Sequence, residues 1–292
     1  MADGRQDFRI GGLTVTRVVE AELPVAGELL SIGSDPPALL ASSPWAIPGL
    51  VTEDGRVYFA LAATCVESEG RKIVIDPWIS FDARRAQPDA PEQAARQLAA
   101  LAGAGFAADE VDLVVSTHID GIGWSTRPLT SDGPRQWVPS FPNARYVWTS
   151  LEIDRVLAED GDDAASLAPL LDAGRVDAVS APHALTSQVR LEPAPGHAPG
   201  NVNVWIESAG DAAVVVGDLV LHPLQLADPD WGGLDADPEQ ARIARRNVLT
   251  AAEKSGALVI GPHFPTPGAF RIEAADGAWR PVDAPTSPPP AG

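Results

Sequence analysis

The most informative segment of this chain reads Val114-Val115-Ser116-Thr117-His118-Ile119-Asp120-Gly121-Ile122-Gly123-Trp124. Its first residues belong to a short, nearly all-apolar run at 111–116, which is typical of a strand buried on both faces. His118 and Asp120 follow where that strand ends. Polar residues on the loops at one edge of a sheet are where the sites of α/β proteins assemble. The stretch therefore predicts a buried strand that carries a histidine and a carboxylate to a sheet edge.

Three other segments repeat this arrangement further along the chain. His197 lies in Pro195-Gly196-His197-Ala198-Pro199-Gly200, Asp218 follows Val216-Gly217, and His263 follows Ile260-Gly261-Pro262. Imidazole and carboxylate together suit a divalent cation such as zinc, manganese or iron. One histidine at a strand end is more often structural than ligating, but four such positions, most of them beside a glycine, favour a shared site.

The composition excludes several classes of function. The chain has 292 residues, and 21 Lys and Arg against 40 Asp and Glu give a net charge of −19. Nucleic acids and anionic membranes are therefore disfavoured as partners, because both need clustered basic residues. The single cysteine, Cys65, excludes a disulfide framework and a cysteine-rich zinc site within one chain. No apolar run approaches the ~20 residues that span a bilayer, and the N-terminus lacks a signal-peptide layout, so a cytoplasmic protein is expected.

Apolar periodicity and turn residues predict two βα halves, with sheets inside and helices outside. The chain is expected to form one domain over residues 1–282, with an irregular arm at 24–56 that includes a short helix near 37–41, and a disordered Pro-rich tail at 283–292. Long loops are expected at 117–140 and 222–237. Helices are expected at 92–103, 150–157 and 164–171, and from Asp237-Pro238 to Gly256. Strands are expected at 7–23, 57–66, 72–76, 111–116, 144–149, 176–179, 188–192, 202–207, 212–216, 257–260 and 269–272.

The order of these segments resembles the metallo-β-lactamase superfamily of hydrolases, most nearly the subgroup of acyl-homoserine lactonases and methyl parathion hydrolase. The resemblance covers roughly residues 8–281. It includes the strand pair ending at Asp76 and the segments Phe141-Pro-Asn-Ala-Arg-Tyr146, Gly196-His-Ala-Pro-Gly200, Leu221-His-Pro-Leu-Gln225 and Gly261-Pro-His-Phe-Pro265. It implies an α/β protein of the αββα sandwich type, with two mixed sheets flanked by helices and the site at the edge between them.

This chain departs from the signature of that family, His-x-His-x-Asp-His after a threonine. If Ile122-Gly123-Trp124 anchors the alignment, Ser116 replaces the first histidine and His118 is the second. If the residues before His118 anchor it, two residues are deleted and His118 is the first. In both alignments Gly121 replaces the last histidine, so two of the seven ligands of the family are lost.

The resemblance implies that five ligand positions survive: His118, Asp120, His197, Asp218 and His263. Such a set implies a reduced, mononuclear metal site, with zinc expected and manganese or iron as alternatives, or no metal at all. His118, Asp120 and Asp218 are the expected catalytic residues. The expected substrate pocket comprises Trp78, Gly121, Trp124 and His222.

The function implied by this resemblance is hydrolysis of an ester, a lactone or a related acyl bond. One alternative is a metal-independent acid–base enzyme, such as a cyclase, lyase or isomerase that tailors a small metabolite, because two facing carboxylates can share a proton beside a histidine base. Another is a pseudoenzyme that only binds a ligand. The partner is expected to be a small molecule, and the resemblance leaves a homodimer through the 24–56 arm open.

Overall fold

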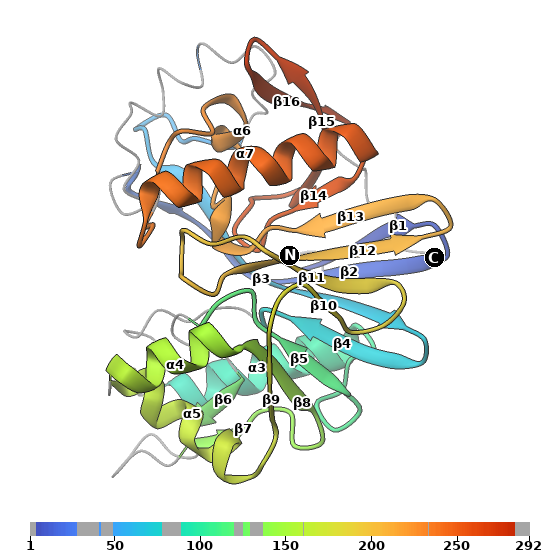
Figure 1. Cartoon of the computed structure of the whole chain (residues 1–292), viewed down its shortest axis with the longest axis vertical. Coiled ribbons are helices and arrows are strands. Elements are labelled where there is room, and N and C mark those ends of the chain that lie inside the picture. The colour runs from blue at the N-terminus through green and yellow to red at the C-terminus, as the bar shows by residue number, and fades with distance from the viewer. Residues whose placement is uncertain are drawn as a thin grey trace.

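The computed structural model describes residues 4–27, 41, 49–77, 89–119, 125–128, 137–159, 161–232 and 234–283. In this part of the chain, two seven-stranded sheets lie face to face (Figure 1). The first sheet has the order β1-β2-β3-β4-β5-β8-β9, and the second runs from β10 to β16 in chain order. A small two-stranded sheet joins β6 (Thr126–Pro128) to β7 (Trp137–Pro139). The predicted αββα architecture is confirmed.

Both large sheets are mixed. In the first, β1 to β4 pair antiparallel, whereas β4, β5, β8 and β9 run parallel. In the second, only β13 and β14 are parallel neighbours. The strands of the first sheet are β1 (Arg5–Ile10), β2 (Leu13–Val25), β3 (Val57–Ser68), β4 (Arg71–Ile75), β5 (Leu113–Val115), β8 (Arg145–Thr149) and β9 (Val176–Val179). Those of the second are β10 (His183–Ala184), β11 (Val189–Pro193), β12 (Val202–Ser208), β13 (Asp211–Val215), β14 (Leu258–Ile260), β15 (Ala269–Ala275) and β16 (Ala278–Asp283).

The helices cover the outer faces of the two sheets. In Figure 1, α3 (Ala90–Gly103), α4 (Ser150–Glu159) and α5 (Asp162–Asp172) lie in the lower half of the view beside β5, β8 and β9, and α7 (Pro238–Ser255) lies in the upper half beside the second sheet. The Asp237 carboxylate caps α7 by accepting a hydrogen bond from the backbone N–H of Gln240 at 3.0 Å, as its sequence predicts. In the part of the chain that the structure describes, no helix is long and apolar enough to cross a membrane.

Burial on both faces explains the apolar sequence of β5. Leu113 and Val115 face the core between the sheets, where they meet β12 and β13, whereas Val114 faces the core under the helices. A strand in this position needs an apolar side chain at every residue. The unbroken apolar run that precedes His118 is therefore a consequence of the sandwich.

The structure corrects several details of the predicted elements. The 117–140 loop contains β6 and β7, and the 222–237 loop contains the short helix α6 (Leu224–Ala227). Strands β10 and β16 were not predicted either. Three of these elements have two or three residues, and α6 has four, which is too few to display a hydrophobic period. Of the helix predicted near 37–41 only Ala41 is described, and it is helical, whereas the tail after Asp283 lies outside the described residues.

Candidate metal site

Three predicted ligands meet at one edge of the sandwich, where strands of both sheets end. His118 follows β5, Asp218 lies in the 3-10 turn after β13 (Gly217–Leu219), and His197 lies in the loop between β11 and β12. The backbone N–H of Val202, at the start of β12, donates to the carbonyl of Thr117 at 2.8 Å. This bond joins the two sheets beside the site, so the loops that carry the ligands are held against each other.

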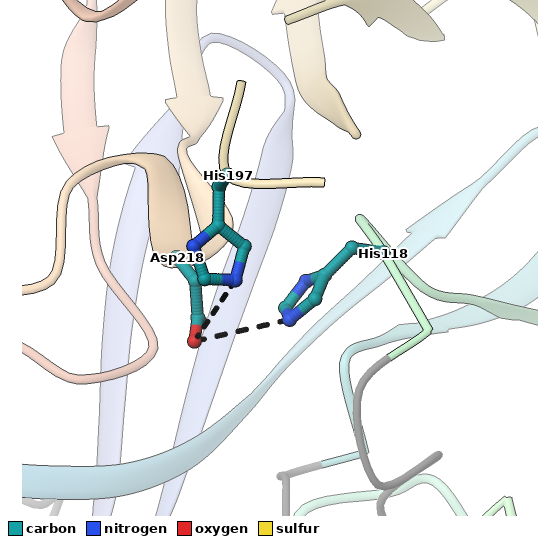
Figure 2. Close-up of side chains that lie close together, drawn as sticks. All are labelled: His118, His197 and Asp218. Atoms are coloured by element: carbon teal, nitrogen blue, oxygen red, sulfur yellow. Dashed lines mark ion pairs between the residues drawn. The ribbon is translucent and has the colours of Figure 1, made fainter. Parts of the chain in front are cut away.

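The three side chains point toward one another (Figure 2). Asp218 Oδ2 lies 3.8 Å from His118 Nε2 and 3.9 Å from His197 Nε2. The ligand atoms of the three residues all lie within 4.8 Å of one another, and all three residues are buried. The two imidazole rings meet edge to face with centroids 4.7 Å apart. These separations are too long for hydrogen bonds, and they leave a common position between the three atoms.

A chain of hydrogen bonds fixes the tautomer of His118. The backbone N–H and the hydroxyl of Thr117 both donate to the Asp76 carboxylate, at 2.8 and 2.9 Å. Because the hydroxyl proton is committed to Asp76, Thr117 Oγ1 accepts from His118 Nδ1, which lies 3.1 Å away. The lone pair of His118 Nε2 therefore faces the common position. Burial lowers the pKa of His118 to about 4, so the ring is neutral near pH 7.

Asp76 and Thr117 were not predicted as parts of the site, although both follow strands that end at this edge. Burial raises the pKa of Asp76 to about 7, against the effect of the two hydrogen bonds from Thr117. Their contacts make them the support of His118 rather than ligands. The position of Asp76, directly after β4, was the sequence signal that could have identified it.

His197 is oriented by a buried ion pair. Its Nδ1 lies 3.4 Å from Asp235 Oδ1, and Asp235 Oδ2 lies 3.1 Å from Nη2 of Arg245, with both of these charged side chains fully buried. Arg245, from α7, also donates to the carbonyls of Leu219 at 2.6 Å and Pro229 at 3.1 Å. A carboxylate on Nδ1 places the proton there and directs the Nε2 lone pair inward. Sequence reasoning missed both Asp235 and Arg245.

His263 contacts Asp218 from the other side. Its Nε2 lies 3.0 Å from Asp218 Oδ1, its Nδ1 lies 2.8 Å from the carbonyl of Ala60, and its ring stacks on Phe59 at 4.1 Å. Both ring nitrogens therefore already face protein oxygens. The loop that carries His263 is held by the buried Arg17, which donates to the carbonyls of Gly261, Pro262 and Phe264.

Asp218 is the charge at the centre of this group. Burial opposes its ionisation, but His263, His118 and His197 outweigh burial and hold the pKa of the carboxyl well below its usual range. The site therefore presents an ionised carboxylate oxygen and two imidazole lone pairs to one buried position. His118 Nε2 is itself buried and, among the described residues, has no hydrogen-bond partner. Two nitrogens and one oxygen in such an arrangement fit a borderline divalent cation such as zinc.

The remaining predicted residues fall into two groups. Asp120, Gly121, Trp124 and Trp78 lie outside the described residues. His222 is fully buried, and its Nδ1 accepts a hydrogen bond from the backbone N–H of Leu224 at 3.2 Å. Burial lowers the pKa of His222 to about 3. These contacts are those of a structural residue, and its assignment to a substrate pocket stays a prediction.

Solved structures with the same fold cover almost the whole chain. AidC, described as a dizinc quorum-quenching lactonase, is 18% identical with a TM-score of 0.75, over 96% of this chain and 97% of its own. The hydrolase AbOPH of the beta lactamase superfamily is 19% identical with a TM-score of 0.75, over 97% and 99%. A probable metal-dependent hydrolase from Staphylococcus aureus is 15% identical with a TM-score of 0.70, over 94% and 99%. No protein-family model matches the sequence, and no curated protein sequence matches it. The chain has the metallo-β-lactamase fold.

Proposed function

We propose that this chain is a metal-dependent hydrolase that cleaves an ester, a lactone or a related acyl bond, with one divalent cation held by His118, His197 and Asp218. The observation that carries the proposal is the convergence of two imidazole Nε2 atoms and a carboxylate oxygen on one buried position. Without a positive charge between them, three electron-rich atoms would face one another in a site of low dielectric. Fold neighbours described as lactonase and hydrolase support the choice of reaction.

A bound divalent cation supplies Lewis acidity, which polarises the scissile carbonyl and stabilises the charge that develops on its oxygen. The protein contributes the orientation of the donors. Thr117 and Asp76 keep the proton of His118 on Nδ1, and Asp235 does the same for His197. Asp218 is ionised near pH 7, because its pKa lies well below the usual range. The sequence assigns the positioning and deprotonation of the attacking water to Asp120, and this role remains part of the proposal.

The ligands that the sequence retains favour one cation rather than two. The resemblance implies that His263 matches a ligand of the second metal. Its Nε2 lies 3.0 Å from Asp218 Oδ1, and its Nδ1 donates to the carbonyl of Ala60 at 2.8 Å. A neutral imidazole has one N–H and the carbonyl of Ala60 accepts it, so the Nε2 lone pair of His263 faces the carboxylate and remains available as a ligand. With Gly121 in place of the last histidine, the second position of the family site would keep few ligands.

Chelation tests the proposal directly. Protein stripped of metal and dialysed is expected to lose hydrolysis of a panel of lactones and aryl esters, and to regain it when one equivalent of zinc, manganese or iron(II) is added. The measurement is the initial rate of acid release for stripped, reloaded and untreated protein. Unchanged turnover by the stripped protein would favour the metal-independent acid–base alternative. If the metal-reloaded protein binds compounds of the panel but hydrolyses none of them, the result would favour the non-catalytic binding alternative.

A further inference from the structure

One buried carboxylate connects the loops that carry His118 and His197. Glu152 lies in the first turn of α4, with only 1% of the residue exposed. Its Oε2 accepts a hydrogen bond from the backbone N–H of Ile119 at 3.1 Å, and its Oε1 accepts one from the backbone N–H of Gly200 at 2.8 Å. Ile119 directly follows His118, and Gly200 lies in the loop of His197. A single side chain therefore spans a loop from each of the two sheets.

The backbone of Gly200 lies so close to Thr149 and Glu152 that a larger residue would not fit. Its carbonyl accepts a hydrogen bond from Oγ1 of Thr149, the last residue of β8, at 2.8 Å. Both its N–H and its carbonyl are therefore hydrogen-bonded to side chains at the junction of β8 and α4. A Cβ at this position would lie 2.4 Å from Thr149 Oγ1 and 2.9 Å from the backbone nitrogen of Glu152. Only glycine lets the loop approach the helix this closely, which gives the last residue of Gly196-His-Ala-Pro-Gly200 a physical role.

The carboxylate is held in its ionised form by its own helix. Arg155 Nη2 lies 2.9 Å from Glu152 Oε2 and also donates to the carbonyl of Ile119. Burial opposes ionisation, but the hydrogen bonds and charge of Arg155 and the two backbone N–H groups outweigh it and lower the pKa of Glu152. An ionised carboxylate offers acceptors to both N–H groups at once, and charge-assisted hydrogen bonds are the stronger kind.

We propose that Glu152 is a positioning residue that sets the separation of His118 and His197 and thereby the affinity of the site for its cation. Glu152 forms hydrogen bonds with the backbone beside each ligand and with Arg155, so it acts mainly through the backbone next to each ligand. This proposal rests on the proposed function, because it requires that the three ligands bind a metal. Outer residues that orient metal ligands typically change metal affinity by about 10- to 100-fold when they are lost.

The test compares Glu152→Gln with Glu159→Gln in the full chain. A glutamine retains the size of the side chain, but its single amide oxygen can accept only one of the two N–H groups, and its NH₂ faces the other. Glu159 lies on the same helix, is exposed, and pairs with Nη1 of Arg155 at 3.1 Å, so it is the matched control. Each stripped protein is titrated with zinc against a chromophoric chelator, and with cobalt(II) while the visible absorption is recorded. Circular dichroism reports whether each variant is folded.

The expected result for Glu152→Gln is zinc affinity about 10- to 100-fold below wild type and an altered cobalt spectrum. Glu159→Gln is expected to match wild type in both. Wild-type affinity and an unchanged spectrum for folded Glu152→Gln would overturn the proposal. If Glu152→Gln does not fold, the shorter Glu152→Asp takes its place; if neither folds, the carboxylate serves the fold and the proposal is wrong. A wild-type chain that binds no metal would instead overturn the proposed function.

Discussion

Replacing Asp218 with asparagine is expected to weaken binding of the cation by more than about 100-fold and to reduce hydrolysis to background. The reason for the large effect is that Asp218 supplies the negative charge that all three histidines face. Losses of outer residues alone cost about 10- to 100-fold in metal affinity, and a direct ligand is expected to cost more. Asparagine keeps the shape of the side chain, so the change isolates the charge.

The measurement for this variant is zinc affinity by competition with a chelator, together with turnover of the substrate found in the panel. Asp172→Asn is the matched control, because Asp172 is an exposed carboxylate at the end of α5. Asp218→Asn protein that is folded and holds zinc as tightly as the control would refute the assignment of Asp218 as a ligand.

Replacing Arg245 with methionine is expected to lower the free energy of unfolding by about 3–5 kcal/mol, the range typical of a buried ion pair that loses one partner. Methionine removes the guanidinium that is paired with Asp235, a carboxylate with no exposed side-chain surface. It also removes the hydrogen bonds to the carbonyls of Leu219 and Pro229, beside the turn that carries Asp218. Urea denaturation measures the change.

Two further variants separate an ion-pair effect from loss of packing. Arg242→Met lies on the same helix, where Arg242 is half-exposed and 4.0 Å from Asp230, so a change of about 1 kcal/mol or less is expected. Adding Asp235→Leu to Arg245→Met removes the unpaired carboxylate and is expected to recover much of the stability. The double variant is not expected to recover metal affinity, because His197 has lost the carboxylate beside Nδ1. Equal losses in Arg245→Met and Arg242→Met would contradict this interpretation.

The fold could be predicted because its main determinants are local in the sequence. All three residues of β5, Leu113–Val115, are apolar, as a strand buried on both faces requires, and Asp237-Pro238 starts α7 where such a pair is expected. Gly217 is another local signal. Its φ is +53°, and a Cβ there would lie 2.4 Å from Thr117 Oγ1. A glycine is therefore required before Asp218, because the ends of β5 and β13 approach each other closely at this point.

The buried charged residues under the ligand loops could not be predicted, because their partners are distant in the sequence. Glu152 is 33 residues from Ile119 and 48 from Gly200, and Arg17 is 245 residues from Pro262. In sequence, each of these charged residues resembles an ordinary surface residue of a helix or strand. Only the packing of the two sheets brings them under the ligand loops, where burial makes their hydrogen bonds obligatory.

A crystal structure of the zinc-reconstituted protein, with anomalous data at the zinc absorption edge and the zinc content per chain, tests the ligand assignment directly. We predict one zinc ion per chain, bound by Nε2 of His118, Nε2 of His197 and the carboxylate of Asp218. An empty site at saturating zinc, two ions per chain, or a single ion bound elsewhere would contradict this assignment.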